Sequence, residues 1–181
     1  MTATRKMMKQ MYKDIKSFEN FLENSPEVCK IIAEAMLKYA DMNEITVDSI
    51  KKKYYIRNPE YDPIEFIKSV CNGERHKEFV RTLGLYWIGY YDASSYTIHT
   101  YCEDFGLGTA VQFILKKDYI GVYLDGYSTG IEVKGLRVKP VKGKLCADKI
   151  HSLEHIDRIP SSIMEDYNDW VLEDYTHQSK E

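Results

Sequence analysis

Residues 85 to 141 constrain the fold most, because they form a closely spaced series of short segments with the composition of β-strands. Five runs are rich in aromatic and β-branched residues, and turn formers such as Asp125 and Gly126 separate them. The runs are 85–91, 96–102, 109–115, 119–125 and 130–141. The gaps between them are too short for crossover helices, so we expect consecutive strands to pair as antiparallel hairpins.

Before Gly84 the apolar residues recur every three or four positions, which is typical of amphipathic helices. The predicted helices are 3–24, 26–40, 47–55 and 63–72, with a further turn or two over 74–82. Ser25, Thr46 and Asp62 are expected to cap three of them through their side-chain oxygens. Gly73 is placed to end the fourth. The first helix has an apolar stripe made of Met8, Met11, Tyr12, Ile15, Phe18 and Leu22.

Helical spacing returns after the strand series, over 146–156 and 161–175. Ser162 and Glu165 form the pattern of a capping box, which marks a helix start. The apolar stripe of that last helix comprises Ile163, Tyr167, Trp170, Val171 and Tyr175. The predicted fold class is therefore α+β, in a single domain over 1–181. Its parts are an N-terminal helical layer over 1–84, a mostly antiparallel sheet of five or six strands over about 85–141, and C-terminal helices over 142–181.

Length and composition narrow the class of protein. A chain of 181 residues with 44% hydrophobic residues can bury a substantial core. No apolar run approaches the roughly 18 residues that a bilayer span needs, and the N-terminus lacks the pattern of a signal peptide. We therefore expect a cytoplasmic protein without a membrane partner.

The four cysteines do not form a metal-binding or redox motif. Cys29, Cys71, Cys102 and Cys146 are too far apart in sequence for a C-x-x-C pair. We expect them to be reduced and to serve as small apolar residues. Neither a metal nor another cofactor is expected.

The net charge of −3 is unevenly distributed along the chain. Residues 1–85 carry a net charge of +2, residues 86–142 are neutral, and residues 143–181 carry −5. Proteins that hold nucleic acid through charge concentrate Lys and Arg on one surface. This distribution therefore does not favour nucleic-acid binding by charge alone.

His99, Tyr101 and Glu103 are the candidates for a catalytic site, because a histidine, a phenol and a carboxylate occur together only here. On a strand His99 and Tyr101 share one face, so with a carboxylate they could act as a general acid and base if a pocket formed over them. The favoured alternative is structural, with His99 and Tyr101 half-buried and the acids solvating a hairpin. We therefore lean towards a protein that is not an enzyme.

A helix-turn-helix is the basis of a second hypothesis. The helix ending near Ala40, the turn over 41–45 and the next helix would present Lys51, Lys52 and Lys53 to nucleic acid. Three adjacent lysines point in different directions around a helix, however, so a solvated surface is the favoured interpretation.

Aromatic residues of the strand series support a third hypothesis, a protein-binding surface. In the run 85–91 both alternating sets of side chains are apolar, so both faces of that strand need to be covered. The chain's own helices can cover one face, whereas the terminal helices, a second copy in a homodimer or a partner protein must cover the other. The residues expected to bind the partner are Tyr86, Tyr90, Tyr101 and Tyr123 of the sheet, and Glu165, Asp169 and Glu173 of the acidic last helix.

The leading functional expectation is a non-enzymatic protein-binding module of the inhibitor, immunity or anti-defence type found in microbes and phages. It depends on the aromatic sheet and the acidic last helix, and an exposed Tyr/Trp patch rimmed by acids would favour it. The alternatives are a nucleic-acid-binding regulator that uses the helix-turn-helix segment, over about 26–56, and a small enzyme with a site near His99.

Overall fold

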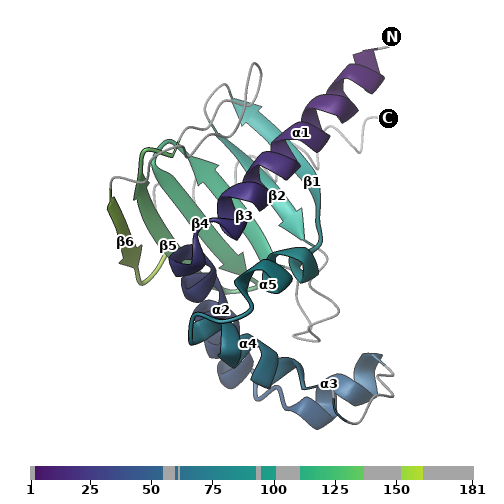
Figure 1. Cartoon of the computed structure of the whole chain (residues 1–181), viewed down its shortest axis with the longest axis vertical. Helices are drawn as coiled ribbons and strands as arrows, with labels where there is room; N and C mark the ends of the chain where they lie inside the picture. The colour runs from purple at the N-terminus through teal and green to yellow at the C-terminus, as the bar shows by residue number, and fades with distance from the viewer. Residues whose placement is uncertain are drawn as a thin grey trace.

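A computed structural model describes residues 3–54, 60, 62–92, 95–100, 111–136 and 152–160 of the chain. Within these ranges the chain forms five helices and then six strands (Figure 1). The helices are α1 (Ala3–Glu23), α2 (Pro26–Met42), α3 (Val47–Tyr54), α4 (Pro63–Cys71) and α5 (His76–Leu83). The strands are β1 (Leu85–Asp92), β2 (Ser95–Thr100), β3 (Val111–Lys116), β4 (Tyr119–Leu124), β5 (Tyr127–Lys134) and β6 (Ser152–Ile156).

The six strands form one open sheet in the order β1-β2-β3-β4-β5-β6, and every neighbouring pair is antiparallel. Strands β1 to β5 therefore each pair with the next strand along the chain, as the short gaps predicted, and β6 is added beside β5. Two tight turns use the expected residues, because Asp118 (φ +57°) and Gly126 (φ +90°) supply the left-handed backbone that reverses the chain. The α+β class, with helices first and then an antiparallel sheet, is confirmed.

The sixth strand corrects one prediction. Residues 146–156 were expected to be helical, but Ser152–Ile156 pair with β5 as a strand. Leu153 and Ile156 are three positions apart, which indicated one face of a helix. On the strand they face opposite sides of the sheet, and each is half-buried there. Pairing also satisfies outer backbone groups of β5 between Gly130 and Lys134, a gain that local spacing does not reveal. The last expected helix, 161–175, lies outside the described residues.

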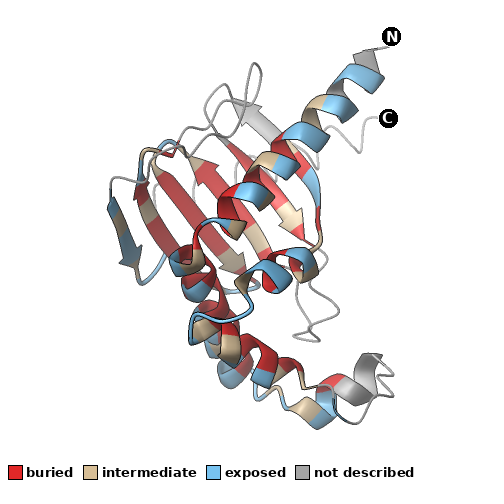
Figure 2. Ribbon diagram, viewed as in Figure 1, coloured by how far each residue is buried: buried red, intermediate tan, exposed pale blue. Residues whose placement is uncertain are grey.

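Helices α1 and α2 pack against one face of the sheet (Figure 1), and the strand centres beneath them are buried (Figure 2). Phe18 of α1 meets Phe113 of β3 edge to face, with ring centroids 5.2 Å apart. At the other side of the sheet, the Lys38 ammonium of α2 lies 5.4 Å from the centre of the Tyr127 ring of β5. The helices α3 and α4 extend away from the sheet (Figure 1).

The helix caps follow the sequence at two of three positions. Asp62 accepts hydrogen bonds from the backbone N–H groups of Ile64 and Glu65 at the start of α4. Thr46 accepts one from the backbone N–H of Ser49 at the start of α3. The capping prediction for Ser25 is wrong, because its buried hydroxyl makes no cap hydrogen bond. The backbone N–H of Ser25 instead donates to the carbonyl of Leu22, which ties α1 to α2 in a tight corner.

Replacing Asp62 with alanine should lower the free energy of unfolding by about 1 kcal/mol, because two backbone donors of α4 lose their acceptor. Urea denaturation followed by circular dichroism measures the change. Asp62→Asn is the matched control, since asparagine also caps well and should cost less than the alanine variant. Equal losses in both variants would show that the cap does not stabilise α4.

The second face of the sheet, opposite the helices, contains two adjacent glycines in register, Gly121 of β4 and Gly130 of β5. The Tyr119 ring lies over Gly130, and the Ile159 side chain lies over Gly121. Burial raises the pKa of the Tyr119 hydroxyl, and the charge of Glu132 raises it further. The glycines thus provide room for two larger side chains to lie flat on this face.

Gly130→Ala should destabilise the protein by about 1–3 kcal/mol, because the new Cβ overlaps the Tyr119 hydroxyl and lies 3.0 Å from Tyr119 Cζ. The double variant Gly130→Ala, Tyr119→Leu removes the ring and hydroxyl that clash. Thermal unfolding of the single variants and the double variant forms a mutant cycle. The substitutions should not be additive, and additive losses would mean that the clash is absent.

Candidate functional site

A shallow apolar groove of about 290 Å³ lies between α1 and the edge strand β1. We call it the edge groove, and its lining residues are Met8, Met11, Tyr12, Ile15, Lys16, Glu19, Leu85 and Tyr86. The helix α1 continues past β1 beyond the sheet (Figure 1), so the groove has an open outer end. Side chains that a longer sheet would bury are therefore left in contact with water.

A bulge at the start of β1 positions the aromatic side of the groove. Leu85 of β1 pairs with Thr100 of β2, and Trp87 pairs with His99. Two steps along β1 therefore match one step along β2, so β1 holds one extra residue here. Because Thr100 and His99 face opposite sides of the sheet, Leu85 points to the helices and Trp87 points away from them. Tyr86, the extra residue, lines the groove beside α1.

Exposed apolar side chains gather at this edge. Tyr12 is 63% exposed, Tyr86 43% and Trp87 48%. Five large hydrophobic side chains are exposed among the described residues. Four of them lie on α1 and β1 at this edge, namely Met8, Tyr12, Tyr86 and Trp87. Only Met42, at the end of α2, lies elsewhere. A concentration of exposed aromatic and methionine side chains is typical of a surface that binds another protein.

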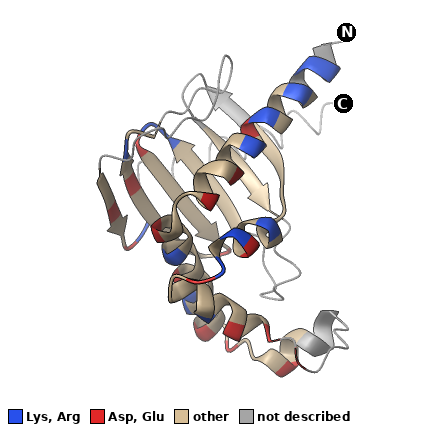
Figure 3. Ribbon diagram, viewed as in Figure 1, with Lys and Arg blue, Asp and Glu red and all other residues tan. Residues whose placement is uncertain are grey.

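The first four turns of α1, which reach the groove, are rich in basic residues. Five basic residues and a single acid, Asp14, occur within positions 3–16 of α1, and Figure 3 shows the basic positions along this half of the helix. The basic residues are Arg5, Lys6, Lys9, Lys13 and Lys16. The acids that were expected beside the aromatic surface, Glu165, Asp169 and Glu173, lie outside the described residues, so that expectation stays a prediction.

Lys16 is the basic residue of this series that lines the groove, and it contacts the ring of Tyr12. Its ammonium lies 5.6 Å from the centre of the Tyr12 ring and donates a hydrogen bond of 3.1 Å to Glu19. The hydrogen bond and the charge of Glu19 raise the pKa of Lys16. Lys16 therefore stays protonated and holds Tyr12 at the groove through a cation–π contact.

The aromatic residues predicted to bind a partner do not share one surface. Tyr86 lines the edge groove, whereas Tyr123 lies on the second face, half-buried, with its hydroxyl accepting a hydrogen bond from the Gly126 N–H. Tyr90 pairs with Tyr96 in β1 and β2, and its side chain lies outside the described part. Four other predicted residues also lie outside it, namely Tyr101, Glu165, Asp169 and Glu173.

Met8 and Tyr12 were assigned to the apolar stripe of the first helix, and their place in the groove was missed. A helix of 21 residues is about 32 Å long, whereas the eight residues of β1 span about 27 Å at most. The difference in length, together with the lysines that flank Met8 and Tyr12, was the available signal that the first turns would lie beyond the sheet.

The catalytic hypothesis gains no support from the described residues. His99 is half-buried on β2 between Trp87 and Gln112, while Tyr101 and Glu103 lie outside the described ranges. Burial raises the pKa of the Cys29 thiol to about 12 and that of the Cys71 thiol to about 11. Both thiols are thus protonated at neutral pH and are poor nucleophiles. No group of three metal-ligating side chains occurs within the described ranges.

The helix pair that suggested nucleic-acid binding is present, because a short turn joins α2 to α3. Glu44 has a left-handed backbone in this turn, with φ +53°. The side chains of Lys51, Lys52 and Lys53 are not among those described, so their direction stays a prediction.

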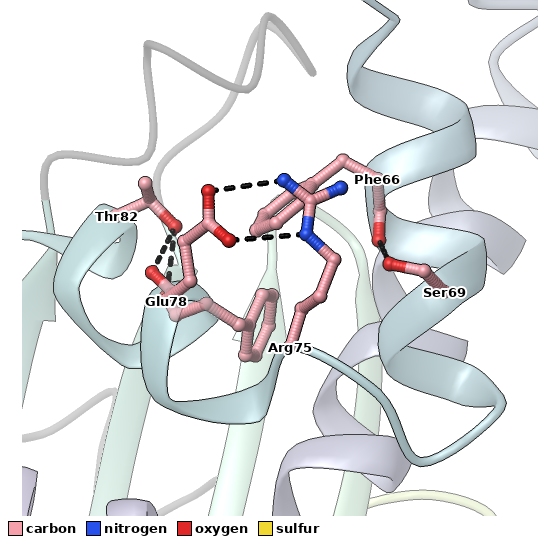
Figure 4. A network of polar contacts seen from close by, with 6 residues as sticks. Phe66, Ser69, Arg75, Glu78 and Thr82 are labelled. Carbon is pink, nitrogen blue, oxygen red and sulfur yellow. Dashed lines mark hydrogen bonds and ion pairs between the residues drawn. The ribbon is translucent and has the colours of Figure 1, made fainter.

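A polar network at the corner between α4 and α5 has a structural role (Figure 4). Arg75 donates two hydrogen bonds of 3.0 Å to Glu78, and its guanidinium lies 4.3 Å from the centre of the Phe66 ring. The hydrogen bonds from Arg75 lower the pKa of Glu78. Arg75 also begins α5 with a left-handed backbone (φ +55°). The charge of Arg75 is paired with Glu78, and its guanidinium contacts the Phe66 ring of α4. We therefore interpret this network as a clamp between α4 and α5.

No described helix is both long enough and apolar enough to cross a membrane. No family model, curated protein or solved structure matches the chain. The function must therefore be argued from the surface itself.

Proposed function

We propose that the chain is a non-enzymatic protein-binding module whose edge groove takes an apolar anchor of the partner. The observation that carries the proposal is the gathering of the exposed side chains Met8, Tyr12 and Tyr86 in the edge groove; Trp87 is exposed on the other face of the same strand. Tyrosine and tryptophan bury a large area on binding and lose little side-chain entropy, so they are frequent anchors in protein interfaces.

The position of β1 and the charge of α1 narrow the kind of partner. In the described part of the chain β1 is the outermost strand of the sheet, beside the edge groove. The positive half of α1 lies beside this edge and favours a partner with acidic residues next to its apolar anchor. The partner class is therefore a protein that presents an extended or helical segment with apolar and acidic side chains.

A role as an inhibitor, immunity or anti-defence protein agrees with this kind of surface. Such proteins act by occupying a partner rather than by turning over a substrate, so they require a binding surface and no convergent catalytic set. The acidic side chains Glu165, Asp169 and Glu173 remain a proposed second contact.

Affinity capture from a lysate of the native host tests the proposal, with mass spectrometry of both the proteins and the nucleic acids that are retained. We expect one protein to be retained in stoichiometric amount after nuclease treatment. Capture that disappears on nuclease treatment would contradict the proposal and would support the nucleic-acid alternative.

The alternative is a nucleic-acid-binding regulator, and the positive half of α1 is the observation in its favour. Binding of this kind would weaken steeply with salt in a gel-shift assay. It would also weaken when Lys51, Lys52 and Lys53 are replaced by glutamine, if the helix pair is the reader. Replacing Lys9 and Lys13 by glutamine gives the matched variant for α1. Absence of binding at low salt would remove this alternative.

A further inference from the structure

The edge groove follows α1 rather than β1. Six of its eight lining residues belong to α1, from Met8 to Glu19, whereas β1 contributes only the neighbours Leu85 and Tyr86. Eleven residues of helix rise about 16 Å, which is about three turns. A segment that fills the groove therefore lies alongside a helix for three turns and meets the sheet at one place.

The apolar residues of α1 have the spacing by which one helix packs on another. Met8, Met11, Ile15, Phe18 and Leu22 follow one another at intervals of three, four, three and four, which is the pattern of a heptad seam. The seam is buried from Ile15 onward, where α1 packs on the sheet. Met11 is half-buried, and Met8, on the part of α1 that projects beyond the sheet (Figure 1), is 59% exposed. The seam therefore continues past the core to a place where its side chains reach the solvent.

The charge of α1 distinguishes between two helical occupants, a second copy of α1 and a helix that carries acids. Lys9 and Lys16 lie three residues before and four residues after Tyr12, so both are its neighbours on the helix surface. Of the nearby acids, Asp14 is buried and Glu19 accepts the hydrogen bond from Lys16. A second α1 would bring lysines against lysines, whereas a helix with Asp or Glu beside its apolar stripe would pair with them.

We infer that the occupant of the edge groove is an amphipathic α-helix of the partner, which packs alongside α1. Its apolar stripe lies against Met8 and Tyr12, and the acidic residues beside that stripe face the exposed side chains of Lys9 and Lys13. Such a helix gains apolar burial and charge pairing from the same surface. The inference rests on the proposed function, because it specifies the segment that the same groove takes.

Photo-crosslinking from both ends of the groove measures the backbone conformation of the occupant. A photoreactive phenylalanine analogue is placed at Met8 in one chain and at Glu19 in another, and the two attachment sites on the captured partner are mapped by mass spectrometry. The distance of about 16 Å between these positions corresponds to about eleven residues of a helix and about five of an extended strand. We expect a separation of about eleven residues in the partner sequence. A separation of about five, or attachment to two separate segments, would overturn the helix and keep the proposed function, whereas absence of any adduct would contradict both.

Synthetic peptides test the helical spacing and the charge without the partner. One fluorescein-labelled peptide has leucines at heptad spacing with glutamates between them, and a second has the same residues rearranged so that the leucines stand at every second position. A third keeps the heptad spacing and has lysine in place of glutamate. We expect the first peptide to bind at least about tenfold tighter than either of the others in a fluorescence anisotropy titration. Equal affinities, or no binding of the first peptide, would overturn the inference.

Charge reversal in the protein locates the binding of the glutamate peptide. The variant Lys9→Glu, Lys13→Glu should weaken its binding by about tenfold or more and strengthen that of the lysine peptide. The matched control Lys30→Glu, Lys117→Glu makes the same change of net charge at exposed positions of α2 and of the turn between β3 and β4, and should leave both affinities nearly unchanged. Equal effects in the two variants would show that net charge rather than the groove attracts the peptide, and would overturn the inference.

Discussion

The Phe113→Ala variant should lose about 3–5 kcal/mol of unfolding free energy, the largest stability effect that we expect from a single substitution in this chain. Phe113 lies at the centre of β3, is fully buried, and meets Phe18 of α1 edge to face. Its removal leaves a cavity between the helices and the sheet and also removes an aromatic contact. Urea denaturation followed by circular dichroism gives the free energy.

Met42→Ala is the control for that measurement. Met42 is exposed at the end of α2, so its truncation should change the free energy of unfolding by less than about 0.5 kcal/mol. Phe18→Ala should cause a loss similar to that of Phe113→Ala, because it opens the same contact from the helix side. A loss below about 1 kcal/mol in both phenylalanine variants would contradict the packing of α1 on β3.

The double variant Tyr12→Ala, Tyr86→Ala should weaken binding of a captured partner by about 100-fold or more, which is the largest functional effect that we expect. Each tyrosine is exposed in the edge groove, and truncation of a tyrosine anchor costs about 2 kcal/mol or more. Titration calorimetry with the purified partner measures the dissociation constant.

The same titration needs a variant that removes an exposed hydrophobic side chain elsewhere. Met42→Ala serves this purpose, and its affinity should match that of the unaltered chain. Thermal unfolding of the double variant shows whether the fold is kept, since neither tyrosine is in the buried core. Unchanged affinity in a folded double variant would exclude the groove as the binding surface.

Local signals were sufficient to predict most of the fold. The change of apolar spacing at Gly84 marks the boundary between the last helix and β1, and Asp62 caps α4 as its position suggested. These features depend on neighbours within a few residues. The strand β6 was predicted as a helix because its pairing with β5 joins residues about 20 positions apart, and only the tertiary contact distinguishes the two structures.

Less of the candidate site could be predicted from the sequence. Tyr86, predicted to bind a partner, is exposed in the edge groove, but Tyr123 was grouped with it although the two lie on opposite faces of the sheet. The bulge at the start of β1 shifts the alternation of side chains there, and no residue type in that run predicts a bulge. The exposure of Met8 and Tyr12 depends on where α1 crosses the sheet, and helical periodicity does not specify the crossing point.

Site-specific photo-crosslinking tests the central claim, that the edge groove binds a partner protein, most directly. A photoreactive phenylalanine analogue is placed at Tyr86 in one chain and at Met42 in another, and both are irradiated in the host lysate. We predict a single protein adduct from position 86 and none from position 42. Retention of the partner without an adduct at position 86, or equal adducts at both positions, would contradict the account.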